Sequence, residues 1–110
     1  RALDYIQFDT NRVGGLTQAR KIAALAEAYS IPVVPHAGQM HNYHLVMASL
    51  NAPMAEFFPV VDVEVGNELF WYLFAGEPQP EDGSIDLSDD VPGLGLSIDE
   101  EALARFDVIE

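Results

Sequence analysis

Three ionisable side chains in the first half of the chain are candidates for acid–base chemistry, and two of them form a pair. Asp9 ends the apolar run LDYIQFD, and His36 ends the apolar run IPVVPH. If the runs are neighbouring parallel strands about 4.8 Å apart, both side chains leave the sheet at the same edge. A carboxylate there holds the histidine tautomer and stabilises the imidazolium formed on proton capture. The pattern favours a general base; a capping aspartate and a structural histidine are the alternative.

The third candidate, Glu56, lies in the apolar run MAEFFPVV. Burial would favour a protonated carboxyl group that donates a hydrogen bond. The alternative is a strand-end glutamate that is hydrated or held in an ion pair.

Other polar residues surround these three. Arg12 follows Asp9 in the same loop and could either bind an anionic substrate or neutralise Asp9. His41 and His44 are one helical turn apart, and both are candidates for substrate contact. With His36 they would make a three-histidine metal site, but no HExxH motif accompanies them, so we expect no metal ligand in this chain.

The elements that must position these residues follow from hydrophobic periodicity. Residues 3–9 and 31–34 are predicted strands, and residues 17–29 form an amphipathic helix with Thr17 or Gly15 near its cap. Strand, helix and strand make a βαβ unit with parallel strands. A second helix over 41–51 and a third strand over 54–61 complete a β-α-β-α-β order.

The second half is less regular. The aromatic segment 66–74 fits either a short helix or an extended segment, and apolar residues in 62–74 suggest a subunit contact. Asp82–Gly83 before 84–87 predicts a hairpin turn, and 99–105 predicts a short helix capped by Ser97 or Asp99. Buried parallel sheets need cover on both faces, so the chain resembles the last portion of a larger α/β domain.

Composition narrows the class of protein. The chain has 110 residues, 49% of them hydrophobic, and no cysteine, which fits a cytoplasmic enzyme and excludes disulfides and thiolate sites. The net charge is −13 and is concentrated in residues 56–110, so we expect no nucleic-acid partner. No apolar stretch approaches the length of about 18–20 residues that spans a membrane, so we expect no membrane partner. The first residue is Arg1, which suggests a processed chain, a fragment or one piece of a longer protein.

The ordered combination of motifs resembles one known family. The segment IQFDTNRVGGLTQARKIAALAEAYSIPVVPHAGQMHNYHLVMASLN and the later AEFF carry an aspartate followed by GGLT, a VPH strand end, and an acid twenty residues beyond the histidine. The tail adds Asp82–Gly83 and PGLG. These features resemble the end of the barrel domain in the enolase superfamily, mandelate racemase subgroup, and most of all acid-sugar dehydratases of the L-rhamnonate dehydratase type.

The resemblance implies a fold and a site. The fold would be an α/β (β/α)7β TIM-like barrel, with strands six to eight in residues 1–61 and an irregular acidic tail, 62–110, that returns to a capping domain. His36 would be the general base, Asp9 its dyad partner, and Glu56 the acid that hydrogen-bonds the substrate carboxylate or enediolate. The family's Mg²⁺ is held by three carboxylates, which we expect outside this chain.

The same resemblance implies a reaction and partners. We expect a Mg²⁺-dependent sugar-acid dehydratase that yields a 2-keto-3-deoxy acid. The alternatives are a racemase or epimerase of the same superfamily, or a non-catalytic structural fragment. The expected partners are a small sugar-acid substrate, the remainder of the same enzyme, and further copies of it in a homo-oligomer.

Overall fold

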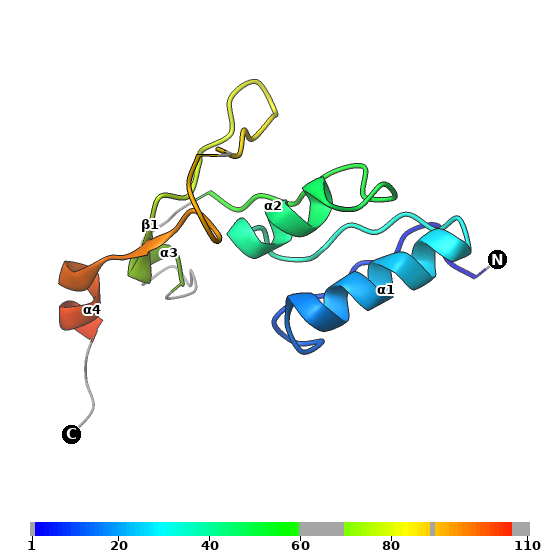
Figure 1. Ribbon diagram of the computed structural model, residues 1–110, viewed down its shortest axis with the longest axis horizontal. Coiled ribbons are helices and arrows are strands. Elements are labelled where there is room, and N and C mark those ends of the chain that lie inside the picture. The colour runs from blue at the N-terminus through cyan, green and yellow to red at the C-terminus, as the bar shows by residue number, and fades with distance from the viewer. Residues whose placement is uncertain (1, 60–69, 89, 107–110) are drawn as a thin grey trace. The chain divides into compact units, whose positions relative to one another are not determined.

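The computed structural model describes residues 2–59, 70–88 and 90–106, and the chain divides into two compact units, Arg1–Phe58 and Pro59–Glu110. The first unit contains helices α1 (Leu16–Ala28) and α2 (Met40–Met47). The second contains α3 (Phe70–Leu73), β1 (Phe74–Ala75), β2 (Ser97–Ile98) and α4 (Glu100–Phe106). Figure 1 shows the course of the chain through these elements.

Two segments of the first unit lie side by side as parallel neighbours. Ile6 pairs with Val33 and Asp9 pairs with His36 as isolated parallel bridges. Three backbone hydrogen bonds of 2.8 to 3.0 Å join the segments, named with the donor first: Ile6 to Pro32, Val34 to Ile6, and His36 to Phe8. The predicted parallel pairing is confirmed. It takes the form of bridges rather than a continuous ladder, in keeping with two prolines in the second segment that donate no backbone hydrogen bond.

Helix α1 crosses between the two paired segments and covers them with small side chains. It begins after Gly15, whose φ of 83° is readily adopted only by glycine, so Gly15 rather than Thr17 is the cap. Its inward face presents Ala19, Ala23 and Ala26, all nearly inaccessible to solvent. The predicted helix agrees with the observed one to within one residue at each end.

The core of this unit lies between α1, α2 and the paired segments. Its buried members are Phe8, Ala19, Ala23, Ala26, Val33 and Leu45. Because the contributions from α1 are alanines, the helix can approach the paired segments closely. This packing holds the ends of those segments, where Asp9 and His36 lie.

Helix α2 ends earlier than the sequence pattern predicts. Its last residue is Met47 instead of residue 51, and the Ser49 hydroxyl donates to the Leu45 carbonyl at 2.7 Å. The Ser49 N–H bonds to Val46 instead, at 3.1 Å, so the i to i−4 pattern is lost here.

The predicted third strand is not formed in the part of it that the structure describes. Residues 54–59 have no regular secondary structure, and residues 60 and 61 lie outside the described part. A strand exists through pairing, and Pro53 and Pro59 at the ends of this run carry no N–H. The strand prediction over 54–59 is therefore wrong for this structure.

The second unit has a short antiparallel pair, in which Phe74 faces Ile98 and Ala75 faces Ser97. For residues 66–74 the sequence allows either a short helix or an extended segment. The described part contains both, since α3 is helical and β1 begins at Phe74. Residues 66–69 lie outside the described residues. So do residues 62–65, and with them most of the suggested subunit contact over 62–74.

Two local predictions in the second unit are confirmed. Glu81 and Ser84 bond to each other through both backbone groups, and positive φ angles at Asp82 and Gly83 close the two-residue turn between them. The Asp99 carboxylate accepts the Ala102 N–H at 2.9 Å, so Asp99 caps α4. Within the described residues, no helix is long and apolar enough to cross a membrane.

Candidate active site

The candidate site begins with the bridge between Asp9 and His36. Backbone pairing sets these two residues opposite each other, so their side chains leave the ends of the two paired segments together. Nδ1 of His36 lies 3.8 Å from Oδ2 of Asp9. This distance is longer than a hydrogen bond but close enough for electrostatic attraction once the imidazole is protonated. The structure thus brings together the pair that the sequence predicts.

Asp9 is held by several groups of its own loop. Its Oδ1 accepts the backbone N–H groups of Asn11 at 2.8 Å and Arg12 at 3.3 Å. Its Oδ2 accepts Nε of Arg12 at 3.2 Å. Of the two roles that the sequence left open for Arg12, the geometry fits the pairing with Asp9. Its guanidinium is nevertheless largely exposed, so contact with substrate stays a prediction.

The His36 imidazole has one side toward Asp9 and remains accessible. Its side chain is 49% exposed, whereas that of Asp9 is 18% exposed. The ring of Phe58 meets it edge to face, with centroids 6.1 Å apart and planes at 69°. Because Nδ1 faces Asp9, Nε2 is the nitrogen left to meet a ligand.

Glu56 lies beside the residue that follows His36. Its Oε2 accepts the Ala37 N–H at 2.6 Å, and the side chain is half-buried. Of the two forms that the sequence leaves open for Glu56, a protonated donor or a hydrated or ion-paired carboxylate, this contact tests neither, because it uses one oxygen only as an acceptor. The structure therefore joins Asp9, His36 and Glu56 in one neighbourhood.

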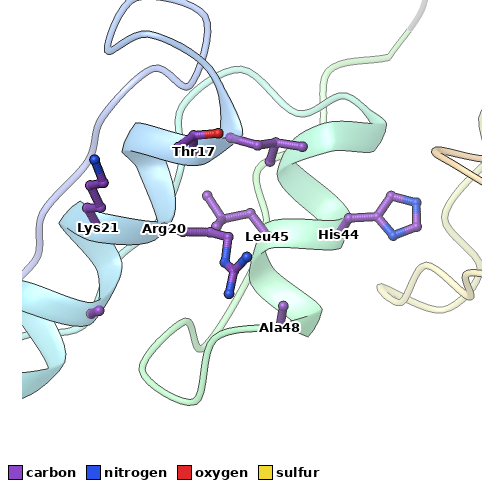
Figure 2. Close-up of a pocket in the computed structure, with 8 residues that line it drawn as sticks. Thr17, Arg20, Lys21, His44, Leu45 and Ala48 are labelled. Carbon is purple, nitrogen blue, oxygen red and sulfur yellow. The ribbon is translucent and has the colours of Figure 1, made fainter.

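The other two histidines lie in different surroundings. His41, in the first turn of α2, is buried; burial lowers its pKa from the ordinary value of 6.5, and the Asp9 carboxylate opposes this effect. His44 is half-buried and lines a groove of about 610 Å³ between α1 and α2, together with Arg20 and Lys21. The His44 ring points away from α1 (Figure 2).

The histidines do not assemble a metal site. None of Asp9, His36 and Glu56 lines the groove that contains His44. Across residues 2–59, 70–88 and 90–106, no three His, Cys, Asp or Glu side chains are grouped closely enough to hold a metal ion.

The loop between His36 and α2, and Asn42 in the first turn of α2, contain site residues that the sequence motifs do not indicate. Ala37, Gly38 and Gln39 all have positive φ angles, of 66°, 32° and 78°. The side chain of Asn42, which is 2% exposed, donates to the carbonyl oxygens of His36 at 2.8 Å and Gly38 at 2.7 Å. The sequence feature that could have indicated Asn42 is its position, because an amide residue in the first turn of a helix commonly bonds to the backbone.

Comparison with known proteins shows the kind of enzyme that contains such a segment. An L-rhamnonate dehydratase of Saccharopolyspora erythraea is 37% identical over 105 residues, covering 93% of this chain and 26% of the relative. The crystal structure of L-rhamnonate dehydratase from Gibberella zeae matches with a TM-score of 0.79 and 39% identity, over 98% of this chain and 30% of that one. An enolase from Pantoea ananatis with bound D-gluconate and Mg matches with a TM-score of 0.78 and 30% identity, over 94% of this chain and 25% of that one.

Mg²⁺ is the metal of this group of proteins, and rhamnonate dehydratase from G. zeae has also been solved with it. The residues described here do not fit a complete Mg²⁺ site. Asp9 already accepts two backbone N–H groups and the Arg12 guanidinium, and Glu56 bonds to Ala37. A three-carboxylate cluster is missing from the described ranges.

The extent of these matches is large in this chain and small in its relatives. The chain spans about a quarter of the length of the curated relatives it matches, 26–27%. The family model for enolase C-terminal domain-like proteins matches residues 1–102. The chain is thus an α/β portion of a TIM-barrel-type domain. It belongs to the enolase C-terminal domain-like family of the enolase superfamily.

Proposed function

We propose that the chain is the C-terminal part of a Mg²⁺-dependent sugar-acid dehydratase. It would remove the proton α to the substrate carboxylate and eliminate water to give a 2-keto-3-deoxy acid. One observation carries this proposal: paired strand ends hold the Asp9 carboxylate 3.8 Å from the His36 imidazole, with Glu56 bonded to the next residue. The similarity to rhamnonate dehydratases supports the choice of reaction.

The proposed proton path follows from the orientation of His36. Nε2 takes the α-proton as the C–H bond breaks, while Asp9 stabilises the imidazolium from the Nδ1 side. The same nitrogen then gives its proton to the departing β-hydroxyl, so that water leaves and the resulting enol becomes the ketone. Oε1 of Glu56 is the oxygen left for the substrate, since Oε2 accepts the Ala37 N–H, and a proton shared between Glu56 and the substrate carboxylate or enediolate would form their hydrogen bond. The metal would supply charge stabilisation of the enediolate, from ligands outside this chain.

The remaining expectations join this proposal. In the complete barrel, where a neighbouring strand could pair with residues 54–59, residues 1–61 would form strands six to eight, and residues 62–110 the tail that returns to the capping domain. Arg12, His41 and His44 would contact substrate. A homo-oligomer is expected, and light scattering on the complete protein would test it.

The test uses the complete enzyme, because the chain spans only a quarter of its relatives. Sugar acids such as L-rhamnonate, D-galactonate and D-gluconate are assayed for 2-keto-3-deoxy product with the parent protein and the His36→Asn variant. Loss of the general base should lower kcat by about 10²- to 10⁴-fold while circular dichroism and Tm stay near the parent's. Parent-level turnover in His36→Asn would refute the role of His36 and favour the structural-fragment alternative.

A racemase or epimerase is the second candidate, because the same Asp9–His36 pair can remove an α-proton without any elimination. Solvent deuterium incorporated at the α-carbon, with no dehydrated product from any sugar acid, would support this second candidate over the first.

A further inference from the structure

The loop that follows His36 has a conformation that its own residues do not favour. Ala37 and Gln39 have φ angles of 66° and 78°, in the left-handed region that L side chains rarely adopt. Such a backbone persists only when the surrounding contacts hold it. The peptide groups next to the catalytic candidate therefore depend on groups outside the loop.

The Asn42 side chain helps to hold this loop from the helix side, together with the N–H groups of Asn42 and Tyr43 that bond to the Gln39 carbonyl. Its two amide hydrogens go to the carbonyl oxygens of His36 and Gly38, at 2.8 and 2.7 Å. Carbonyl oxygens only accept, so Nδ2 must face them and Oδ1 must face the other way. There Oδ1 accepts the hydroxyl of Thr10 at 2.5 Å. Thr10 is 1% exposed and Asn42 is 2% exposed, so water does not compete strongly for these bonds.

This arrangement connects the two halves of the proton-transfer pair. Thr10 directly follows Asp9 in the chain, and the bonded carbonyl belongs to His36 itself. The Asn42 amide thus spans from the end of one paired segment to the end of the other. Glu56 holds the following peptide through Ala37, so Asn42 and Glu56 both bond to the segment that includes and follows His36.

We propose that Asn42, oriented by Thr10, is a positioning residue that sets the His36 imidazole against Asp9 and the substrate α-carbon. The proposal rests on the function proposed above. Asn42 itself would exchange no proton. Its effect would be on geometry, which matters because misplacement of a base by about 1 Å can cost about 100-fold in rate.

A matched control distinguishes positioning from plain stability. Asn51 bonds to two backbone carbonyls in the same unit, as Asn42 does: its Nδ2 donates to the carbonyls of Ala23 and Ile31 at 3.1 and 3.0 Å. Those carbonyls belong to the interior of α1 and to the start of the second paired segment, whereas Asp9 and His36 pair at the other ends of the two segments. Asn42→Ala and Asn51→Ala should therefore both lower Tm, but only the first should alter catalysis.

The experiment compares these variants in the complete enzyme, using substrate with hydrogen or deuterium at the α-carbon. In Asn42→Ala we expect kcat to fall by about 10- to 100-fold and the isotope effect to rise, because proton abstraction becomes more rate-limiting. Asn51→Ala should keep kcat and the isotope effect close to the parent's. Equal Tm losses with parent-like kcat and isotope effect in Asn42→Ala would overturn the proposal.

A second variant keeps the test decisive if Asn42→Ala does not fold. Thr10→Val removes only the hydroxyl that orients the Asn42 amide, whereas Thr10→Ser retains it. We expect a lower kcat and a raised isotope effect in Thr10→Val and restored values in Thr10→Ser; parent-like values in Thr10→Val would overturn the proposal. If His36→Asn is inactive while these variants are normal, the positioning role fails alone. An active His36→Asn variant would instead remove the proposed function.

Discussion

Replacement of Asp9 by asparagine tests the electrostatic contact on which the proton-transfer pair depends. Asn keeps the shape of the side chain and an oxygen that can still accept the Asn11 N–H. What it loses is the negative charge 3.8 Å from Nδ1 of His36. The imidazolium formed on proton capture then lacks its neighbouring counter-charge, so the barrier to proton abstraction should rise.

The size of this effect follows from distance and exposure. Two unit charges 3.8 Å apart attract by about 1 kcal/mol in water and about 4 kcal/mol at an effective dielectric constant of 20. The lower part of this range applies, because the His36 side chain is 49% exposed and Arg12 shares the same Asp9 oxygen. A loss of about 1–2 kcal/mol corresponds to a decrease in kcat of about 5- to 30-fold.

The assay measures product formation and α-proton exchange in D₂O with the complete enzyme. Glu27→Gln, which removes an exposed carboxylate from α1, serves as the charge-matched control. A loss as large as that of His36→Asn would refute the argument, because it would mean that Asp9 fixes the tautomer as a catalytic-triad aspartate does, an effect of about 10⁴-fold. An unchanged kcat would refute the pair itself.

Three further changes test neighbouring features. Glu56→Gln keeps an acceptor for Ala37, so Tm should stay near the parent's, while the amide, which cannot share a proton with the substrate carboxylate as a carboxyl group can, lowers kcat/KM by about tenfold in steady-state assays; a collapsed Tm would contradict this. Burial lowers the pKa of His41 from 6.5, so its protonation in the unfolded state costs stability as pH falls below about 6.5. His41→Gln should therefore reduce the loss of Tm between about pH 7 and 5, and identical pH profiles would count against it. Gly38→Ala places a Cβ 3.0 Å from the Glu56 carbonyl and should cost about 1–3 kcal/mol of unfolding free energy, more than Gly83→Ala, whose Cβ meets nothing within 4 Å.

The regular elements of the first unit could be predicted where burial repeats along a single segment. The alanines of α1 recur on one face, so the helix was predicted to within one residue at each end. The strand prediction over 54–59 is wrong because a strand depends on a pairing partner, and the composition of a segment does not specify one. Helix α2 was predicted too long because the Ser49 hydroxyl competes for the Leu45 carbonyl, a choice that periodicity does not encode.

The site was predictable where it follows from strand ends and not where it follows from loop conformation. Asp9 and His36 each end an apolar run, and parallel pairing is enough to bring them together. The positive φ angles of Ala37 and Gln39 contradict the ordinary preference of these residue types, so they could not be predicted from the sequence. The hydrogen bonds from Asn42 to the His36 and Gly38 carbonyls depend on that conformation, so the sequence does not predict them either.

The bridge between Asp9 and His36 also bears on how such an enzyme can be divided. Both partners, with Glu56, lie in one compact unit and reach each other through a single crossover. A chain break introduced on the N-terminal side of the Asp9 segment would leave them on one polypeptide, whereas a break within α1 would separate them. We expect split versions of the complete enzyme to regain activity on mixing far more readily in the first case. A recombination event on the N-terminal side of Asp9 would therefore transfer all three proton-transfer groups together.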